Sequence, residues 1–313
     1  MRFLLDAEQA EFGRTLDRML GAADTPQAIR AWAGGDAGPG RALWGRLAEA
    51  GVFALAVPEP YEGVGPLPVE LAVSYVELGR HAVPGPVVET AAVAALLDGT
   101  EAAKEWLPRI AAGDVVVTLA SGPYALDADT ADAVFVTDGD GTVRLAAGHG
   151  PLRGSADPAR RLFVPDGGGE VVARGAKVRE AADLASLLTA AQSLGVGLEL
   201  LRRTVEYVRQ REQFGVPVGT FQAVKHRLAD ALVGLEFARP LLFGAALSMT
   251  SSDIAAAKLA AGEAAYATAR VALQLHGAVG YTEELDLSLW LRKARPLRDA
   301  WGTPSACRER VLE

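Results

Sequence analysis

The sequence predicts a mostly α-helical protein with a small β domain between an N-terminal helical domain and a C-terminal four-helix bundle. Helical periodicity dominates residues 1–116, short β-branched segments fill residues 117–178, and strong helical periodicity returns in residues 179–313. The 313 residues are enough for two or three domains. We therefore predict three domains with these boundaries, the middle one reduced in size.

The N-terminal region contains helices joined by Gly/Pro-rich loops. Residues 42–51 carry apolar side chains at helical spacing and end at Gly51, which is a helix C-cap signal. Residues 58–66 form a turn-rich loop with three prolines and two glycines. Residues 68–80 are helical again.

The middle region changes to short segments rich in β-branched residues and bounded by Gly and Asp turns. This composition is typical of strands in a small antiparallel β unit. The segments that we expect to form strands are Asp114–Ala120, Ala133–Thr137, Thr142–Ala146, Arg161–Pro165 and Glu170–Ala173.

The C-terminal region is strongly helical. Its first helix carries one apolar stripe over six turns, from Leu184 to Val205. Helical segments at about 221–249, 253–276 and 283–298 follow, and their number predicts a four-helix bundle. Pro240 is expected to kink or divide the first of these three segments.

Composition excludes several classes of function. The net charge of -8, without any run of Lys or Arg, argues against nucleic-acid and membrane-surface partners. Cys307 is the only cysteine, and the four histidines lack metal-ligand spacing, so no metal site is predicted. The first residues have too short an apolar run for a signal peptide, and no stretch reaches about 18 uncharged apolar residues. We expect a soluble cytoplasmic protein.

Two motifs in the C-terminal half carry a resemblance to a known family. The first is Arg211-Glu-Gln-Phe-Gly215, followed by Phe221-Gln222, and the second is Gln274-Leu-His-Gly-Ala-Val-Gly-Tyr-Thr282. Together they resemble the C-terminal half of acyl-CoA dehydrogenases. The resemblance covers nearly the whole chain, is specific in its C-terminal half, moderate in its N-terminal half and poor in the middle. It implies the same helix–sheet–helix order.

The resemblance implies that Arg211 reaches across a subunit interface to the pyrophosphate of an FAD held by the neighbouring subunit. Phe214 and Gln222 belong to the same cofactor-binding stretch. A guanidinium suits this role because it is always charged and can fork onto phosphate oxygens. The alternative is an exposed arginine at a helix end, followed by a turn.

The second motif is implied to contact the adenine end of the same FAD through Gln274 and the backbone at Gly277. Glycine lets the main chain approach a ligand closely. The alternative is a loop that caps a helix, and Gly277 could serve both purposes. His276 is expected to be structural or a minor cofactor contact, and not a catalyst.

The catalytic base of the family is missing. Family members abstract an α-proton with a glutamate while hydride passes from the substrate Cβ to flavin N5, which needs a carboxylate within hydrogen-bond reach. That position is Trp301 here, and an indole cannot accept a proton. The alternative base position of the family falls at Ala185. Gly302 and Thr303, implied to pack near a flavin, are present, with a simple turn as the alternative.

Asp299, Glu283 and Glu284 are possible substitutes for the base, but solvated surface positions are the simpler interpretation on an acidic protein. The family also holds its own flavin ring with a loop in the middle domain. The corresponding stretch here, Thr118–Tyr124, diverges, and the region is several dozen residues short. This chain therefore keeps what it would lend to a neighbour's FAD and lacks what it needs for its own.

This pattern predicts one subunit of an α2β2 FAD-dependent acyl-CoA dehydrogenase, with FAD at the interface and the glutamate on the partner. It resembles the heteromeric enzymes of actinobacterial steroid side-chain degradation, so an acyl-CoA ester of that type is implied by analogy. Two other hypotheses stay open. One is a flavin-dependent monooxygenase of the same fold. The other is a non-catalytic interaction protein.

Overall fold

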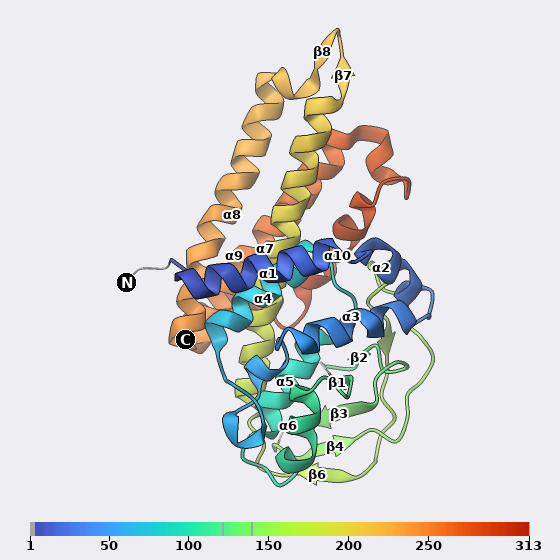
Figure 1. Cartoon of the computed structure of the whole chain (residues 1–313), viewed down its shortest axis with the longest axis vertical. Helices are drawn as coiled ribbons and strands as arrows, with labels where there is room; N and C mark the ends of the chain where they lie inside the picture. The colour runs from blue at the N-terminus through green and yellow to red at the C-terminus, as the bar shows by residue number, and fades with distance from the viewer. Residues whose placement is uncertain (1–3, 121, 139, 313) are drawn as a thin grey trace.

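The computed structural model describes residues 4–120, 122–138 and 140–312. Two earlier expectations fall partly outside the described residues. The apolar run considered as a signal peptide includes Met1–Phe3, and the divergent loop includes Ser121. Three stretches of structure follow one another along the chain, and Figure 1 shows the small sheet at one end and a long helical pair projecting at the other. The mostly α fold with a small β region is confirmed, and the division into domains at the stated boundaries stays a prediction.

The N-terminal stretch is helical, as expected. Its α-helices are α1 (Ala7–Gly21), α2 (Thr25–Ala33), α3 (Gly38–Glu49), α4 (Pro68–Arg80), α5 (Val87–Leu97) and α6 (Ala103–Ala111). The short 3-10 turns η1 (Ala54–Ala56) and η2 (Glu59–Tyr61) fill the turn-rich loop between α3 and α4. Helix α5 is buried on nearly every side and carries a single charged residue, Glu89.

The middle stretch contains six short strands: β1 (Val117–Leu119), β2 (Ala125–Leu126), β3 (Ala133–Thr137), β4 (Val143–Leu145), β5 (Leu162–Phe163) and β6 (Val171–Ala173). They form a four-stranded sheet in the order β1-β3-β4-β6 and a separate β2-β5 pair.

The expectation of a purely antiparallel unit was wrong, because β1 pairs with β3 in parallel. Residues 120–132 are too long a connection for a hairpin and include β2, which pairs with β5 instead. A connection of that length lets β3 return in the same direction as β1.

The C-terminal stretch is a helical bundle built around α9 (Ser251–His276), which packs against α7 (Val178–Gln210), α8 (Gln222–Ser248), α10 (Leu287–Asp299) and α11 (Pro304–Leu312). Pro240 does not divide α8, so that part of the expectation was wrong. The proline and Glu236, whose carbonyl loses a helical partner, are both exposed, while Leu235, Ala238 and Leu242 around them are buried. Packing of this inner face holds the helix together across the missing hydrogen bond.

Helix α7 is the central element of the molecule. Its backbone crosses α4 in direct contact, because a Cβ added at Gly195 would lie 1.9 Å from the Val76 carbonyl oxygen, and one at Gly79 would lie 2.2 Å from that of Gln192. The buried hydroxyls of Thr189, Ser193 and Thr204 donate to carbonyls one turn back within α7, Thr189 to Ala185 at 2.7 Å. The N-terminal helices are therefore fixed directly against the bundle.

Two helices, α7 and α8, are long and apolar enough to pass a length and hydropathy test for membrane spans. The apolar window of α7 is 94% buried, as expected of a core helix. The window of α8 is only 39% buried, and Glu236 pairs with Arg239 on its exposed side. Helix α8 therefore presents an apolar face that the described part of the chain does not cover.

Candidate functional site

The first motif forms a hairpin at the far end of the long helical pair. Strands β7 (Glu212–Gln213) and β8 (Val216–Pro217) flank Phe214 and Gly215, which adopt φ of 55° and 80°. Positive φ at both central residues is the pattern of a type I′ turn, so the Phe-Gly pair makes the turn itself. The Phe214 side chain is 91% exposed at its tip, and Figure 1 shows this tip projecting beyond the rest of the chain.

Arg211 ends α7 at the base of this hairpin. Its backbone N–H donates to the Tyr207 carbonyl at 2.8 Å, and its own carbonyl accepts from Val218 at 2.8 Å. The backbone is thus fixed, while the exposed guanidinium makes no ion pair with any described residue. Gln222, also exposed, begins α8 just beyond the hairpin. These residues face outward.

The second motif lies at the same end of the bundle. His276 closes α9, and its ring stacks on Tyr207 of α7 with centroids 4.1 Å apart. Its Nδ1 lies 2.8 Å from the Ala272 carbonyl, and burial lowers the pKa of the imidazole. A buried, stacked and neutral ring agrees with the structural role expected of His276.

Gly277 turns the chain out of α9 into the 3-10 segment η4 (Gly277–Tyr281). It adopts φ of 63°, which favours glycine, and a Cβ there would meet open space. Gln274 is exposed one turn before it, and Arg227 of α8 donates through Nη1 to the Gln274 Oε1. The structure therefore brings the two motifs to one outward-facing end, and their contact with a cofactor stays a prediction.

Trp301 occupies a different, closed place in the molecule. Its indole Nε1 donates to Glu89 Oε1 at 3.0 Å, across 212 positions of sequence. Glu89 is only 3% exposed, and this is its one side-chain hydrogen bond within the described residues. The space around the pair is also lined by Leu126, Arg160, Thr189, Gln192 and Lys293. The cavity there holds about 10 Å³, the lower limit of what one water molecule needs.

The turn that carries Trp301 is held by a buried lysine. Lys258 of α9 donates through Nζ to the carbonyls of Leu297 at 3.0 Å, Arg298 at 2.9 Å and Gly302 at 3.2 Å. Burial lowers the pKa of Lys258 to about 8. This clamp fixes the end of α10 and leaves Trp301 in a left-handed conformation with φ of 53°.

Gly302 and Thr303 take local roles in the same turn. A Cβ on Gly302, whose φ is 139°, would lie 3.0 Å from Cys307 Sγ, so glycine is needed there. The Thr303 Oγ1 accepts from the Ala306 N–H at 3.3 Å and caps α11. Their contact with a cofactor stays a prediction.

The middle stretch closes the pocket from its other side. Asp127 follows Leu126 with φ of 54°, is fully buried, and accepts the Trp32 indole N–H at 3.0 Å. Burial and the nearby Glu89 raise the pKa of Asp127 to about 7. Lys293 of α10 pairs with Asp157 at 3.4 Å in the same region. Buried polar contacts therefore join the middle stretch to α2 on one side and to α10 of the bundle on the other.

Glu89 is the residue that the sequence analysis missed. It is the one acidic residue among those that line the described pocket, and its signal was a lone charge in an otherwise apolar helix. The acidic residues that could replace the missing base lie outside this pocket. Glu283 pairs with Arg292, and Asp299 is half-exposed beside Arg298. Glu284 is exposed, and Ala185 is fully buried within α7.

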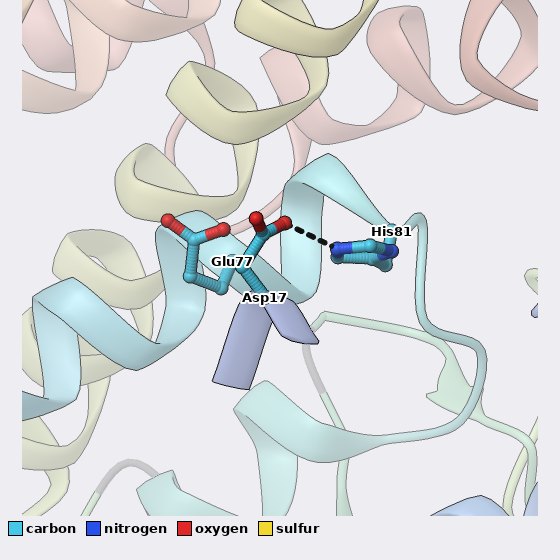
Figure 2. A group of neighbouring side chains, drawn as sticks. All are labelled: Asp17, Glu77 and His81. Carbon is cyan, nitrogen blue, oxygen red and sulfur yellow. Dashed lines mark hydrogen bonds and ion pairs between the residues drawn. The ribbon is translucent and has the colours of Figure 1, made fainter. Parts of the chain in front are cut away.

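A separate group of titratable side chains lies between α1 and α4. Figure 2 shows Asp17, Glu77 and His81, with the Asp17 carboxylate 2.8 Å from His81 Nε2. Burial raises the pKa of Glu77 to about 7, and the nearby Asp17 charge adds to the effect. Their three ligand atoms converge within 4.8 Å, a grouping that histidine spacing could not reveal. Arg80, 3.7 Å from Glu77, already supplies a cation there.

Comparison with known proteins identifies relatives over most of the chain. Residues 6–114 match the acyl-CoA dehydrogenase N-terminal domain, and residues 176–313 match the acyl-CoA dehydrogenase C-terminal domain. The chain is 34% identical over 273 residues to acyl-CoA dehydrogenase IpdE2 of Mycobacterium tuberculosis, covering 86% of this chain and 85% of the relative.

Solved structures show the same fold. A chain of the ChsE4-ChsE5 complex from Mycobacterium tuberculosis superimposes with a TM-score of 0.86 at 24% identity, covering 100% of this chain and 98% of that one. A chain of the Tcur3481-Tcur3483 steroid ACAD gives a TM-score of 0.81 at 24% identity, with 97% and 96% coverage.

Proposed function

The chain belongs to the acyl-CoA dehydrogenase family of flavoprotein oxidoreductases, and on this premise we propose that it is the base-less subunit of a heteromeric enzyme. The partner subunit carries the catalytic glutamate and holds the flavin ring. This chain lends Arg211, Phe214, Gln222, Gln274 and Gly277 to that FAD across the interface. The assembly is an α2β2 tetramer in the cytoplasm that desaturates an acyl-CoA thioester.

The closed pocket at Trp301 carries the proposal. The family's reaction needs a base for the α-proton and a flavin that accepts the hydride. A space of about 10 Å³ admits neither a flavin ring nor an acyl thioester. The one acidic side chain that lines it, Glu89, already accepts the Trp301 N–H. This chain's own pocket therefore does not fit the cofactor.

The outward-facing end of the bundle fits a different task. Arg211 offers a guanidinium free of any carboxylate in the described chain, and Phe214 is 91% exposed. A large aromatic side chain and an unpaired charge at one projecting tip are typical of contacts made with another molecule. These residues suit a phosphate-rich ligand that another subunit holds.

The uncovered face of α8 supports a protein partner. Leu232, Val233, Phe237, Leu241 and Leu247 are exposed there, Phe237 by 72%. An apolar stripe of this size on one helix favours burial against another subunit. Two structural relatives bear the names of two-chain assemblies, which favours a related second chain as that subunit. By the same analogy we propose an acyl-CoA ester of a steroid side chain as substrate.

The experiment is co-purification with a dehydrogenase-like partner, followed by flavin quantitation. Arg211→Ala should weaken FAD retention in the complex by about 1.5–3 kcal/mol, the range for hydrogen bonds to charged groups. Arg211→Lys should restore only part, because lysine lacks the planar fork. Arg209→Ala is the matched control, since Arg209 is also exposed and lies two residues before Arg211. Unchanged FAD content in Arg211→Ala would exclude the proposed role.

A further inference from the structure

One side-chain hydrogen bond at the outward-facing end joins α8 to α9. Arg227 lies in the second turn of α8 and donates through Nη1 to the Gln274 side-chain oxygen in the last turn of α9. Both residues are exposed, and they stand 47 positions apart in sequence. The bond therefore joins the two helices at the place where Gln274 would meet a ligand.

The chemistry of this bond fixes the orientation of the Gln274 amide. A guanidinium only donates hydrogen bonds, so the amide must turn its oxygen toward Arg227. The amide nitrogen, with its two N–H donors, then faces away from Arg227. The Gln274 main-chain carbonyl is already occupied, because it accepts the Gly277 N–H that ends α9. The side-chain N–H groups are therefore what Gln274 offers outward.

The charge of Arg227 also stays available. Its partner is a neutral amide, and no carboxylate of the described residues lies within ion-pair distance of it. Arg227 thus adds a second uncompensated guanidinium to the end of the bundle that carries Arg211. A site with outward N–H donors and surplus positive charge selects ligand groups that accept hydrogen bonds and carry negative charge.

We infer that Arg227 is a positioning residue that holds the Gln274 amide with its N–H donors outward, toward acceptor atoms of the partner-held FAD. The inference rests on the proposed function. Without Arg227, the free Gln274 side chain would sample several rotamers and both amide orientations, and this freedom would be lost on binding. Arg227 therefore acts through Gln274 and need not touch the cofactor.

The test measures FAD affinity of the stripped heteromeric complex by quenching of flavin fluorescence during titration with FAD. Arg227→Met keeps the apolar stem and removes the donors, and it should raise the FAD Kd by about 2- to 10-fold. Arg227→Lys should recover part of this loss. Gln274→Glu keeps an acceptor for Arg227 but presents no donor outward, so it should weaken FAD at least as much. Arg270→Met, an exposed arginine one turn before Gln274, is the matched control.

The double variant decides whether Arg227 acts through Gln274. In a Gln274→Ala background, Arg227→Met should cost clearly less affinity than in the wild-type background, because only the charge of Arg227 is then left to lose. The melting temperature should stay within a degree or so of wild type, as for a surface pair. An equal loss in both backgrounds would mean that Arg227 meets FAD directly, which overturns the positioning role. Unchanged affinity in Arg227→Met, with a loss in Arg211→Ala, overturns this inference alone. No loss in either variant overturns the proposed function as well.

Discussion

Replacing Trp301 with phenylalanine separates a structural role of this side chain from a catalytic one. The change removes the N–H that Glu89 accepts at 3.0 Å and leaves a carboxylate that is 3% exposed without its side-chain partner. Hydrogen bonds to charged groups contribute about 1.5–3 kcal/mol, and we expect a loss of stability in that range. Flavin content and turnover of the complex should not change.

The measurement is urea unfolding and the thermal midpoint of the purified complex, alongside steady-state turnover with an electron-accepting dye. Trp44→Phe is the control for losing the larger ring alone, because Trp44 is a buried tryptophan whose indole N–H has no partner in the described chain. Glu89→Gln in the Trp301→Phe background should recover part of the loss, since a neutral amide is less costly to bury than a carboxylate. If Trp301→Phe abolishes turnover without unfolding or loss of FAD, Trp301 belongs to the working site and our reasoning fails.

Three further predictions follow from the same features. Trp301→Glu restores the family residue but not the flavin loop of the middle region, so it should create neither activity nor extra flavin; a second flavin per pair of subunits would contradict this. Expressed alone, the chain should be flavin-poor and should gain FAD only with its partner. An absorbance spectrum of the purified protein measures this, and one FAD per chain in the protein purified alone would refute it. Glu77→Gln should stabilise the protein above neutral pH. The pKa of Glu77 in the folded protein is about 7, above the ordinary 4.5, so ionising this buried carboxyl lowers the free energy of unfolding. That loss is absent below about pH 4.5 and complete above about pH 7. The gain should approach roughly 3 kcal/mol at pH 8 and vanish at pH 4, and unfolding curves that differ equally at both pH values would count against it.

Local signals in the sequence determined much of this protein. The predicted segments 221–249 and 253–276 match α8 and α9 to within two residues at each end. Gly215 follows Phe214 in a tight turn, and glycine adopts the positive φ of that turn without strain. Periodicity and turn chemistry depend on neighbours in sequence, so they predicted the fold class, and the two motifs carried the resemblance to the family.

The tertiary structure decided what depends on residues far apart in the chain. The parallel pairing of β1 with β3, the continuity of α8 through Pro240, and the Arg227–Gln274 bond all depend on contacts that no local pattern encodes. The family resemblance predicted that Trp301 stands at the position of the base, but only the tertiary packing brought Glu89 of α5 within hydrogen-bond distance of the indole. The space is filled because Glu89 is buried, Trp301 is partly buried, and the two share one hydrogen bond. Such packing exists only once the elements have met.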